Sequence, residues 1–487
     1  MTPVFLPAIL IIGAFFRFYN NTAIALWHDE AFSALYLRYP WGEMMYRIGL
    51  DVHPPLYYLV LRVWSYFAGA SLWSLRLVSI FFAVLTIWSA YIFVKAAFHN
   101  KKLALLAALF IAINPFQIQY ALEARMYTLG TFFALWSSYF LVRALDQQNE
   151  NKNFSRYWLG YALTLAAGFY THYYLLFTIT AQGLYLLIYA FKSRSIKIFL
   201  SGIGAYVIAA ILYLPWIKTF LAQLSRVEAS YWIPPMNRWS VPGTVWKMIF
   251  GGQGASHIPL IITSAVSLIV IYYFAKKVRN PAKWLIIFGV VIPIIAAVAL
   301  SLRTNIYLDR YFVFASLFFS ILIAVAFNAI PNRFARRVIM IALAAVSIFA
   351  FFKNWTDLAV KDKPGMAAAA NLVNQNAKPG DSIYVGSSFI FFTFKYYNAT
   401  PIKPLLYSTA KLEEIPHFSG TAILTNNDLI TDFRKTEKGQ TVWLLWTTGF
   451  GGSKPDVPKP WRQIEEQSYR DAPGFKGLIF VTKYQVN

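Results

Sequence analysis

The sequence contains no cysteine, which excludes both a disulfide framework and any metal site with cysteine ligands. Charged residues are also scarce: they make up 13% of the 487 positions, against 58% for hydrophobic residues. Acidic side chains are the rarest over residues 1–356, which hold nine of them beside 29 basic ones. The net charge of +23 therefore lies mostly in the hydrophobic part of the chain. Because no basic soluble domain accompanies it, nucleic acid is not an expected partner.

Long hydrophobic runs are abundant and similar in length. Each is about 17–22 residues long, the length with which an α-helix crosses a hydrocarbon core of roughly 30 Å. We predict eleven spans, at 3–19, 75–94, 103–120, 126–142, 157–172, 174–191, 198–217, 258–275, 284–302, 311–330 and 336–352. The sequence therefore predicts a polytopic α-helical membrane protein that is embedded in a lipid bilayer.

Basic residues predict the orientation of these spans, since Lys and Arg gather in cytoplasmic connections. The short even-numbered connections are the basic ones, for example at Lys95, Lys192 and Lys276. Most acidic residues of the membrane part fall in the odd-numbered connections, as Asp29 and Glu228 do. We therefore expect a multi-pass protein of the cell membrane with a cytoplasmic N-terminus. Its active site and its C-terminal domain are expected on the extracytoplasmic face.

The pattern changes beyond Lys353. Short β-rich stretches alternate there with helix-like segments such as 364–377. The expected strands are Ser382–Gly386, Thr421–Thr425, Thr441–Trp446 and Leu478–Tyr484. Alternation of this kind is typical of a small α/β domain.

Two domains follow from these patterns. We predict a transmembrane domain over 1–356 and a small extracytoplasmic α/β domain over 357–487. The transmembrane domain has two long connections on its outer face, at 20–74 and 218–257. Long loops on one face of a scaffold often carry function, so candidate residues are sought there first.

An acidic cluster opens the first of these loops. The cluster consists of Asp29 and Glu30 near the start of the loop, and of Glu43 and Asp51 further along it. Carboxylates at a membrane boundary are costly to desolvate, so a cluster there indicates chemistry. One interpretation is a general base, Asp29, that deprotonates an acceptor hydroxyl with Glu30 beside it. The other is an N-cap, because Asp favours the position before a helix, here expected over 30–37.

The same loop continues with Asp51-Val52-His53-Pro54-Pro55. Proline favours the first turn of a helix, so Asp51 could cap a short helix that starts at Pro54. Alternatively, an acid and an imidazole two residues apart could hold a divalent cation or a phosphate-bearing ligand. Both interpretations stay open on the residues alone.

Three further motifs fall at outer-face helix ends. They are Glu123-Ala124-Arg125-Met126-Tyr127, Thr171-His172-Tyr173-Tyr174, and Asp309-Arg310-Tyr311 with Arg303 just before it. Each has a structural interpretation: an ion pair of Glu123 with Arg125, an interfacial histidine, or helix anchoring by Arg and Tyr. Anchoring residues are expected on both faces of the membrane, however, whereas these acidic and histidine motifs lie almost wholly on one. Their distribution favours a shared site.

The motifs of the first loop resemble a known superfamily. Asp29-Glu30 followed by Asp51-Val52-His53-Pro54-Pro55-Leu56 is similar to the protein O-mannosyltransferases, a superfamily of GT-C membrane glycosyltransferases that includes the lipid A aminoarabinose transferases. The Glu123–Tyr127 and Arg310-Tyr311 motifs look like those of its bacterial members. The resemblance covers about 1–330 and implies a GT-C catalytic domain over 1–356, followed by an extracytoplasmic tail. The large soluble insertion of the eukaryotic members is missing.

The resemblance also implies a role for each motif. Asp29 is implied as the catalytic base, with Glu30 in support and Glu123 as a second acid. The residues implied to bind the donor phosphate are Arg125, Arg310 and Arg303, and those implied to line the donor site are Asp51, His53, Tyr127 and Tyr311. An acid before the Pro-Pro pair helps to bind a metal in the aminoarabinose branch. This implies a divalent metal held by Asp51, His53 and His172.

Together the motifs predict an inverting glycosyltransferase that moves a hexose or pentose from a polyprenyl-phosphate-linked donor to an acceptor hydroxyl. A lipid-linked donor is expected because the chain has no Asp-x-Asp pair for a nucleotide sugar. The acceptor is expected to be a glycolipid, a cell-envelope polysaccharide or a protein. The alternative class is a transporter or flippase for lipids or polyprenyl-linked sugars, but transporters place charges at mid-membrane, often at broken helices.

Overall fold

The computed structural model describes residues 2–487 except 20, 23, 150–155, 230–231, 253, 335, 340, 342–344, 347, 350–351, 353–364 and 472–476. The chain forms two compact units. The first, called the helical unit below, comprises Met1–Tyr19, His53–Trp64 and Arg76–Asn354. The second, called the mixed unit, comprises Asn20–Val52, Ser65–Leu75 and Trp355–Asn487. Part of the first long loop thus shares a unit with the C-terminal residues.

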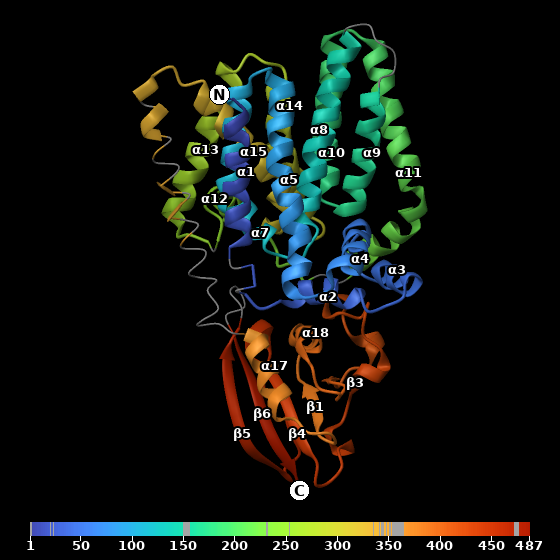
Figure 1. Ribbon diagram of the computed structural model, residues 1–487. Coiled ribbons are helices and arrows are strands. Elements are labelled where there is room, and N and C mark those ends of the chain that lie inside the picture. Colours follow the sequence, from blue (N-terminus) through green and yellow to red (C-terminus); the bar gives the residue numbers. More distant parts are fainter. Residues whose placement is uncertain are drawn as a thin grey trace. The chain divides into compact units, whose positions relative to one another are not determined.

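The helical unit contains most of the predicted spans (Figure 1). Its helices are α1 (Thr2–Phe18), most of α4 (Leu56–Ala68) and α5 (Leu72–Phe98), α6 (Lys101–Ile113), α7 (Pro115–Ala121), α8 (Tyr127–Asn149), α9 (Arg156–Thr171), α10 (Leu175–Lys192), α11 (Ile196–Ala229), α12 (Ser240–Phe250), α13 (His257–Lys277), α14 (Lys283–Ser301) and α15 (Val313–Asn328), with the 3-10 turn η1 (Asp309–Phe312) before α15.

The prediction of a polytopic α-helical membrane protein is confirmed. Among the described residues, six helices are long and apolar enough to cross a membrane, or seven if the bent pair α6–α7 is one span. Helices α1, α8 and α9 also coincide with predicted spans. Seven of the 17 residues of the eleventh predicted span, 336–352, lie outside the described residues, so the number eleven is not confirmed. The short helix expected after Pro54-Pro55 is α4.

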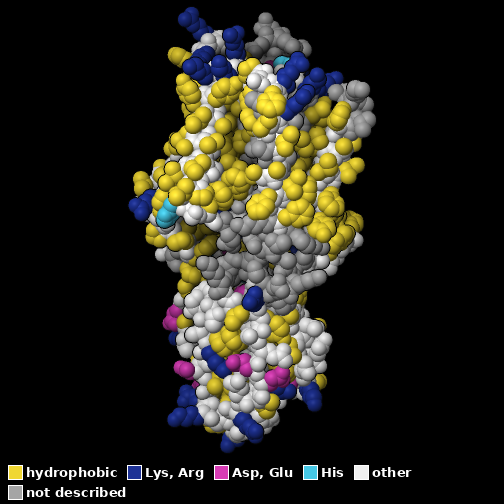
Figure 2. Space-filling view, turned by 90° about the vertical axis from the view of Figure 1, so that its left-hand side faces the viewer, with side chains coloured by type: hydrophobic (Ala, Val, Ile, Leu, Met, Phe, Trp, Pro, Cys, Tyr) yellow, Lys and Arg dark blue, Asp and Glu magenta, His cyan; other side chains and the backbone are white. Residues whose placement is uncertain are grey.

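The surface of the helical unit is suited to lipid. Figure 2 shows a broad band of hydrophobic side chains over it, with Lys and Arg gathered at one end. Exposed side chains such as Val207 on α11 and Ile269 on α13 contribute to this apolar surface. Lipid tails cannot form hydrogen bonds with the backbone. Segments that cross the bilayer are therefore expected to be helices, which satisfy their own backbone N–H and C=O groups.

A buried arginine satisfies the backbone at the bend between α6 and α7. Pro115 has no N–H, so the hydrogen-bond ladder is interrupted and the axis turns by 59°. The Arg17 guanidinium, 1% exposed, donates to the carbonyl oxygens of Ala112 at 2.8 Å and Ile111 at 3.1 Å. These are carbonyls of the last turn of α6, which a helix end leaves without a helical partner. The arginine therefore binds α1 to the kinked span.

The mixed unit is built on a six-stranded sheet with the order β3-β2-β1-β4-β6-β5 (Figure 1). Its strands are β1 (Ser382–Val385), β2 (Leu405–Tyr407), β3 (Leu429–Ile430), β4 (Thr441–Thr447), β5 (Trp461–Arg470) and β6 (Leu478–Val486). Strands β1 to β4 are parallel, whereas β6 runs antiparallel to β4 and β5. The helices are α2 (His28–Tyr36), α3 (Trp41–Leu50), α17 (Gly365–Asn376) and α18 (Ser388–Tyr397).

Three of the four expected strands are confirmed, as β1, β4 and β6. The expected strand Thr421–Thr425 is wrong. Gly420 adopts φ +96°, and its carbonyl accepts hydrogen bonds from the N–H groups of Ile423 and Leu424, so the chain turns here. The left-handed conformation of Gly420, which favours glycine, explains the turn.

Helix α2, which carries Asp29 and Glu30, packs on α18 within the mixed unit. Phe32 lies 4.8 Å from Phe392 between ring centroids, and His28 contacts the same ring at 5.7 Å. A Cβ atom on Gly420 would come within 2.3 Å of Phe392, so the turn at this glycine also approaches the cluster closely. The acidic motif is thereby fixed on the C-terminal part of the same unit.

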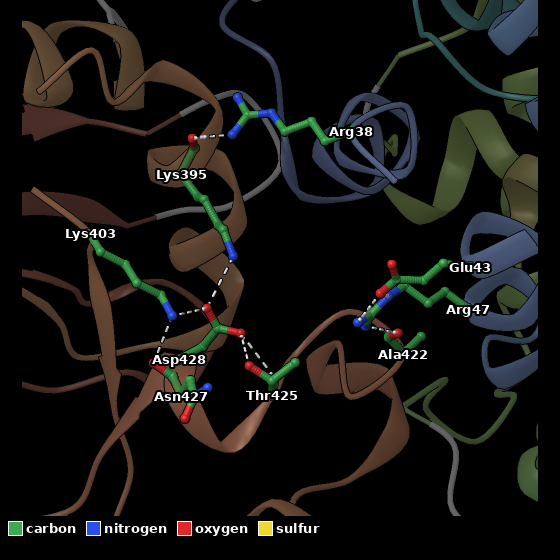
Figure 3. A network of polar contacts seen from close by, with 9 residues as sticks. All are labelled: Arg38, Glu43, Arg47, Lys395, Lys403, Ala422, Thr425, Asn427 and Asp428. Carbon is green, nitrogen blue, oxygen red and sulfur yellow. Dashed lines mark hydrogen bonds and ion pairs between the residues drawn. The ribbon is translucent and has the colours of Figure 1, made fainter. Parts of the chain in front are cut away.

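Figure 3 shows the polar contacts that accompany this packing. The Asp428 carboxylate, from a residue that is 4% exposed, accepts hydrogen bonds from the Thr425 hydroxyl at 2.7 Å and from Lys395 Nζ at 3.2 Å. Lys403 Nζ lies 3.4 Å away. Nearby, Arg47 of α3 pairs with Glu43 at 2.7 Å and donates to the Ala422 carbonyl at 3.2 Å. These contacts join the first loop to the turn after Gly420.

The Asp428 network predicts acid sensitivity of the mixed unit. Burial opposes ionisation of this carboxyl, but the hydrogen bond from Thr425 and the charges of Lys395 and Lys403 outweigh it and hold its pKa below the usual value. A depressed carboxyl pKa stabilises the fold above the unfolded value of about 3.9, and this contribution is lost as pH falls through the lower folded pKa. We expect Asp428→Asn to unfold at lower temperature than wild type at pH 7, with the difference shrinking toward pH 3. Differential scanning fluorimetry across pH measures this, and an equal difference at both pH values would contradict it.

Candidate functional site

Arg125 is the centre of a buried polar cluster in the helical unit. It lies in the turn between α7 and α8 and is 2% exposed. Its Nη1 donates to the Tyr58 hydroxyl at 3.2 Å, and its Nη2 lies 3.1 Å from His53 Nε2. The Arg125 carbonyl accepts from the Ser79 hydroxyl at 3.2 Å. Both its side chain and its backbone are therefore held, which fixes the plane of the guanidinium.

These contacts also define the state of His53. Arginine only donates hydrogen bonds, so His53 Nε2 must be the acceptor, and the ring proton of the neutral form is on Nδ1. The backbone of His53 is held as well, because Gln223 of α11 donates to its carbonyl at 3.3 Å. The Gln223 carbonyl oxygen in turn accepts from the Tyr173 hydroxyl. A chain of hydrogen bonds thus runs from α11 to the Arg125 cluster.

His172 lies close to a group of aromatic rings, just after the end of α9. It is 5% exposed, and its ring centroid lies 5.0 Å from Tyr311 and 5.9 Å from Tyr127. Its Nδ1 accepts from the Tyr174 N–H at 3.1 Å, so the proton of the neutral ring is on Nε2. That Nε2 is buried with no hydrogen-bond partner in the described part of the chain.

The η1 turn carries the last predicted motif. The guanidinium carbon of Arg310 lies 5.9 Å from the ring centroid of Trp232. The backbone N–H of Arg310 donates to the Asp309 carboxylate at 2.7 Å. Asp309 also forms an ion pair with Lys247 of α12. The ring centroids of Tyr311 and Tyr174 lie 4.7 Å apart, which joins this turn to the His172 group. The motif is therefore fixed on three sides by neighbouring helices and turns.

Two further predicted residues of the helical unit differ in how they are placed. The Arg303 side chain is 86% exposed and lies 3.9 Å from Glu228. Glu123 accepts a backbone hydrogen bond from Arg125 through its carbonyl at 2.7 Å, so the two residues share one tight turn. A surface pair such as that of Arg303 contributes little free energy.

Asp29, Glu30 and Asp51 belong to the mixed unit. Asp29 is not the N-cap predicted as the structural alternative: helix α2 starts one residue earlier, at His28, and Asp29 lies in its first turn. Glu30 is fully buried, and its carboxylate accepts from the Trp27 N–H at 3.4 Å. Asp51 follows α3, and its N–H donates to the Arg47 carbonyl at 3.2 Å, so it ends that helix and does not cap α4.

The residues that would hold a metal were predicted as Asp51, His53 and His172. Within the described ranges, no group of three or more His, Asp or Glu side chains could hold a metal ion. One ring nitrogen of each histidine also accepts a hydrogen bond already. His53 Nε2 accepts from Arg125, and His172 Nδ1 accepts from the backbone N–H of Tyr174. The donor set in the structure does not fit the predicted metal site.

Sequence reasoning missed several residues that hold the site together. They are Tyr58, Ser79, Gln223, Trp232 and Lys247. A signal was available for one of them: Gln223 is a fully polar amide on an apolar helix and is 1% exposed. Buried polar groups are normally hydrogen-bonded, so such a residue points to a partner.

Part of the chain is similar to a known protein family. Residues 52–218 match the family model described as dolichyl-phosphate-mannose-protein mannosyltransferase. This range contains His53, Tyr58, Arg125 and His172. The structure is similar to that of ArnT from Cupriavidus metallidurans bound to undecaprenyl phosphate, with a TM-score of 0.64 and 13% identity over 98% of this chain and 97% of that one. The predicted GT-C fold is confirmed.

A second solved structure shares the GT-C fold more loosely. It is the Archaeoglobus fulgidus oligosaccharyltransferase in complex with Zn and sulfate, with a TM-score of 0.54 and 14% identity over 90% of this chain and 67% of that chain. No curated protein matches the chain. At these identities the structural matches establish the GT-C fold. The chain is therefore a multi-pass membrane protein with a GT-C fold, and its activity and substrates are matters for proposal.

Proposed function

We propose that this protein transfers a sugar from a polyprenyl-phosphate-linked donor to an acceptor hydroxyl on the extracytoplasmic face of the membrane, with inversion at the anomeric carbon. The observation that carries the proposal is the buried Arg125, oriented by Tyr58 and His53 inside a region that matches a mannosyltransferase family. A buried guanidinium at the end of a membrane helix bundle is suited to a lipid phosphate, because its planar fork matches phosphate oxygens. The undecaprenyl phosphate in the ArnT structure is consistent with such a ligand.

In this mechanism the arginines stabilise the leaving group. As the bond from C1 of the sugar to the phosphate oxygen breaks, negative charge grows on the lipid phosphate. Arg125 and Arg310 supply fixed positive charge there, and donors that are oriented in advance contribute most to such stabilisation. Arg303 contributes little to the stabilisation of this charge, because its side chain is 86% exposed. Tyr127, Tyr311, Asp51 and His53 would line the donor site.

His172 is proposed as a neutral donor in the same site. Its Nε2–H is buried, and Nδ1 is engaged by the Tyr174 N–H. A buried donor that is left unsatisfied is costly, so a ligand oxygen at this point would recover that free energy. As a metal ligand, Nε2 would have to lose its proton, which would move to Nδ1 and face another donor. No step is therefore assigned to a metal.

The acceptor hydroxyl needs a base, and Asp29 is proposed for that role. A hydroxyl has a high pKa, so a carboxylate must take its proton as the bond to C1 forms. Asp29 is half-buried in the first turn of α2, where the helix dipole favours the ionised carboxylate. Glu30, buried beside it, would help to orient this turn, and Glu123 is the second acid carried over from the family resemblance.

The test is transfer from a panel of radiolabelled polyprenyl-phosphate sugars in membranes that contain wild-type protein or Arg310→Ala. We expect label to move from one donor to a new product in wild type, and a loss of about 10²-fold or more in the variant, as when one transition-state donor is removed. Lys247→Ala serves as a control for disturbance of the η1 turn, since it removes the partner of Asp309 but leaves Arg310. If no donor is consumed while lipid-linked sugar is still translocated, the protein is a flippase and the proposal fails.

A further inference from the structure

Two buried amide side chains lie at the start of α7. Asn114 is the N-cap of this helix, and its Oδ1 accepts from the Gln117 N–H at 2.9 Å. Asn114 is 9% exposed and Gln117 is 3% exposed. A buried amide is unfavourable unless its polar groups are hydrogen-bonded, so the partners of these side chains show what α7 is fixed to.

The Gln117 amide joins α7 to the start of α15. Its Nε2 donates to the Val313 carbonyl at 2.8 Å and to the Ser316 hydroxyl at 2.7 Å, so both of its hydrogens are used. Gln117 and Val313 are 196 positions apart in the sequence. Asn114 adds a contact with the same helix, because its Nδ2 donates to the Ser320 hydroxyl at 3.3 Å. The two amides therefore fix α7 against α15 inside the bundle.

Arg125 and Arg310 lie at the two ends of this connection. Arg125 is in the turn that directly follows α7, and Arg310 is in η1, which directly precedes α15. Residues close to them in sequence meet at one point, since the Tyr127 and Tyr311 ring centroids lie 5.9 Å and 5.0 Å from that of His172. The contact between α7 and α15 is thus a short path between two motifs that face the same site.

Both ends of η1 are held by other elements. Asp309 at its start forms an ion pair with Lys247 of α12. Val313, the first residue after its end, accepts a hydrogen bond from the Gln117 amide. A turn of four residues between two such contacts has little freedom to shift, so the position of Arg310 follows that of α7.

We propose that Gln117 is a positioning residue that sets the separation of Arg125 and Arg310 for the phosphate group of a polyprenyl lipid. That this phosphate is the leaving group of a sugar donor rests on the proposed function. The free lipid phosphate carries more negative charge than the phosphodiester of a lipid-linked sugar, because the electron pair of the broken bond stays on the phosphate oxygen. A pair of cations that is fixed in advance favours the added charge. Gln117 therefore contributes more to transfer and to the binding of undecaprenyl phosphate than to the binding of the donor.

The first test is the binding of undecaprenyl phosphate to the full-length protein in detergent, measured by native mass spectrometry. Gln117→Leu keeps a side chain of similar size and removes both donors. The Ser316 hydroxyl still donates to the Val313 carbonyl at 2.8 Å, so this hydroxyl is not left unsatisfied. We expect Kd to rise about tenfold, as for the loss of neutral hydrogen bonds. Gln119→Leu removes an α7 amide that accepts from the Gly252 N–H at 3.2 Å, and as the matched control it should bind within twofold of wild type.

A double variant separates positioning from a general contribution to stability. If Gln117 acts through the arginine pair, Gln117→Leu should change Kd by less than about twofold in the Arg310→Ala background, where the pair no longer exists. Arg125 remains in that background, so undecaprenyl phosphate should still bind measurably. A variant that merely folds poorly would lower the amount of ligand bound at saturation and leave Kd of the folded fraction unchanged.

Single-turnover transfer gives a second readout. Gln117→Leu should lower the rate per bound donor about tenfold and leave Kd for the donor within about threefold of wild type. The inference is overturned if wild type does not bind undecaprenyl phosphate, if Gln117→Leu binds it like wild type, or if the full effect of Gln117→Leu persists beside Arg310→Ala. With an active wild type, an unchanged transfer rate in Gln117→Leu also overturns it and leaves the proposed function standing. If the binding results are as expected but wild type transfers no sugar, the proposed function fails while the positioning role of Gln117 stands.

Discussion

Replacing Arg125 with lysine is expected to lower kcat/KM for the lipid-linked donor by about 10²–10³-fold, the usual effect of removing one oriented transition-state donor. Lysine retains the positive charge, so a loss of this size would show that the fork geometry matters. Two of the guanidinium donors hold Tyr58 and His53, and this fixes the plane in which the others are presented. An ammonium on a flexible stem has three donors and no such plane.

The matched variants separate orientation from charge. Tyr58→Phe removes one hydrogen bond from Arg125 and keeps the charge, so a smaller loss of about tenfold is expected, the low end for a hydrogen bond from a charged group. Arg125→Gln removes the charge and should also weaken binding of undecaprenyl phosphate itself. Elution volume and thermal unfolding of each purified variant establish that it is folded. Arg125→Lys with activity within threefold of wild type would show that the fork geometry is not needed, and Arg125→Gln with such activity would remove Arg125 from the reaction.

The spans were predictable because bilayer thickness sets their length, and a long apolar run has few alternatives. The same holds for the central strands of the mixed unit: β4 is buried along its length and reads as Thr-Val-Trp-Leu-Leu-Trp-Thr. Strand β5 was missed because it is an edge strand, Trp-Arg-Gln-Ile-Glu-Glu-Gln-Ser-Tyr-Arg, which is exposed over most of its residues. Its position is set by pairing with β6, which no local pattern reveals.

The site was predictable only as a set of candidates. Arg125 and His53 are 72 positions apart, and their contact depends on how α4 and the α7–α8 turn pack. The supporting residues could not be predicted for the same reason, because they are also distant in sequence. Gln223, which donates to the His53 carbonyl, is 170 positions away from it. The N-cap interpretation of Asp29 failed by two residues, because α2 begins at His28 and its N-cap is Trp27. Local propensity locates a helix end only approximately.

Asp29→Asn is expected to give the other large effect, a loss of turnover of about 10²–10⁴-fold, the range in which a general base contributes. Asparagine keeps the size of the side chain and removes its ability to accept a proton. The base acts on the acceptor, so binding of the lipid-linked donor should stay within twofold of wild type. A donor-binding assay and single-turnover transfer, run on the same preparation, measure the two quantities separately.

The control for Asp29→Asn is Glu43→Gln, which also removes one carboxylate from the first loop. Glu43 is 42% exposed and pairs with Arg47 four residues later, a surface contact of small free energy. Its replacement should leave turnover nearly unchanged, whereas a general loss of loop structure would affect both variants. If Asp29→Asn retains near-normal turnover, Asp29 is not the base. Glu30 is fully buried and its carboxylate accepts a hydrogen bond from the Trp27 N–H, so it is a poor alternative base. Glu123 would then be the first of the other acids to test by substitution.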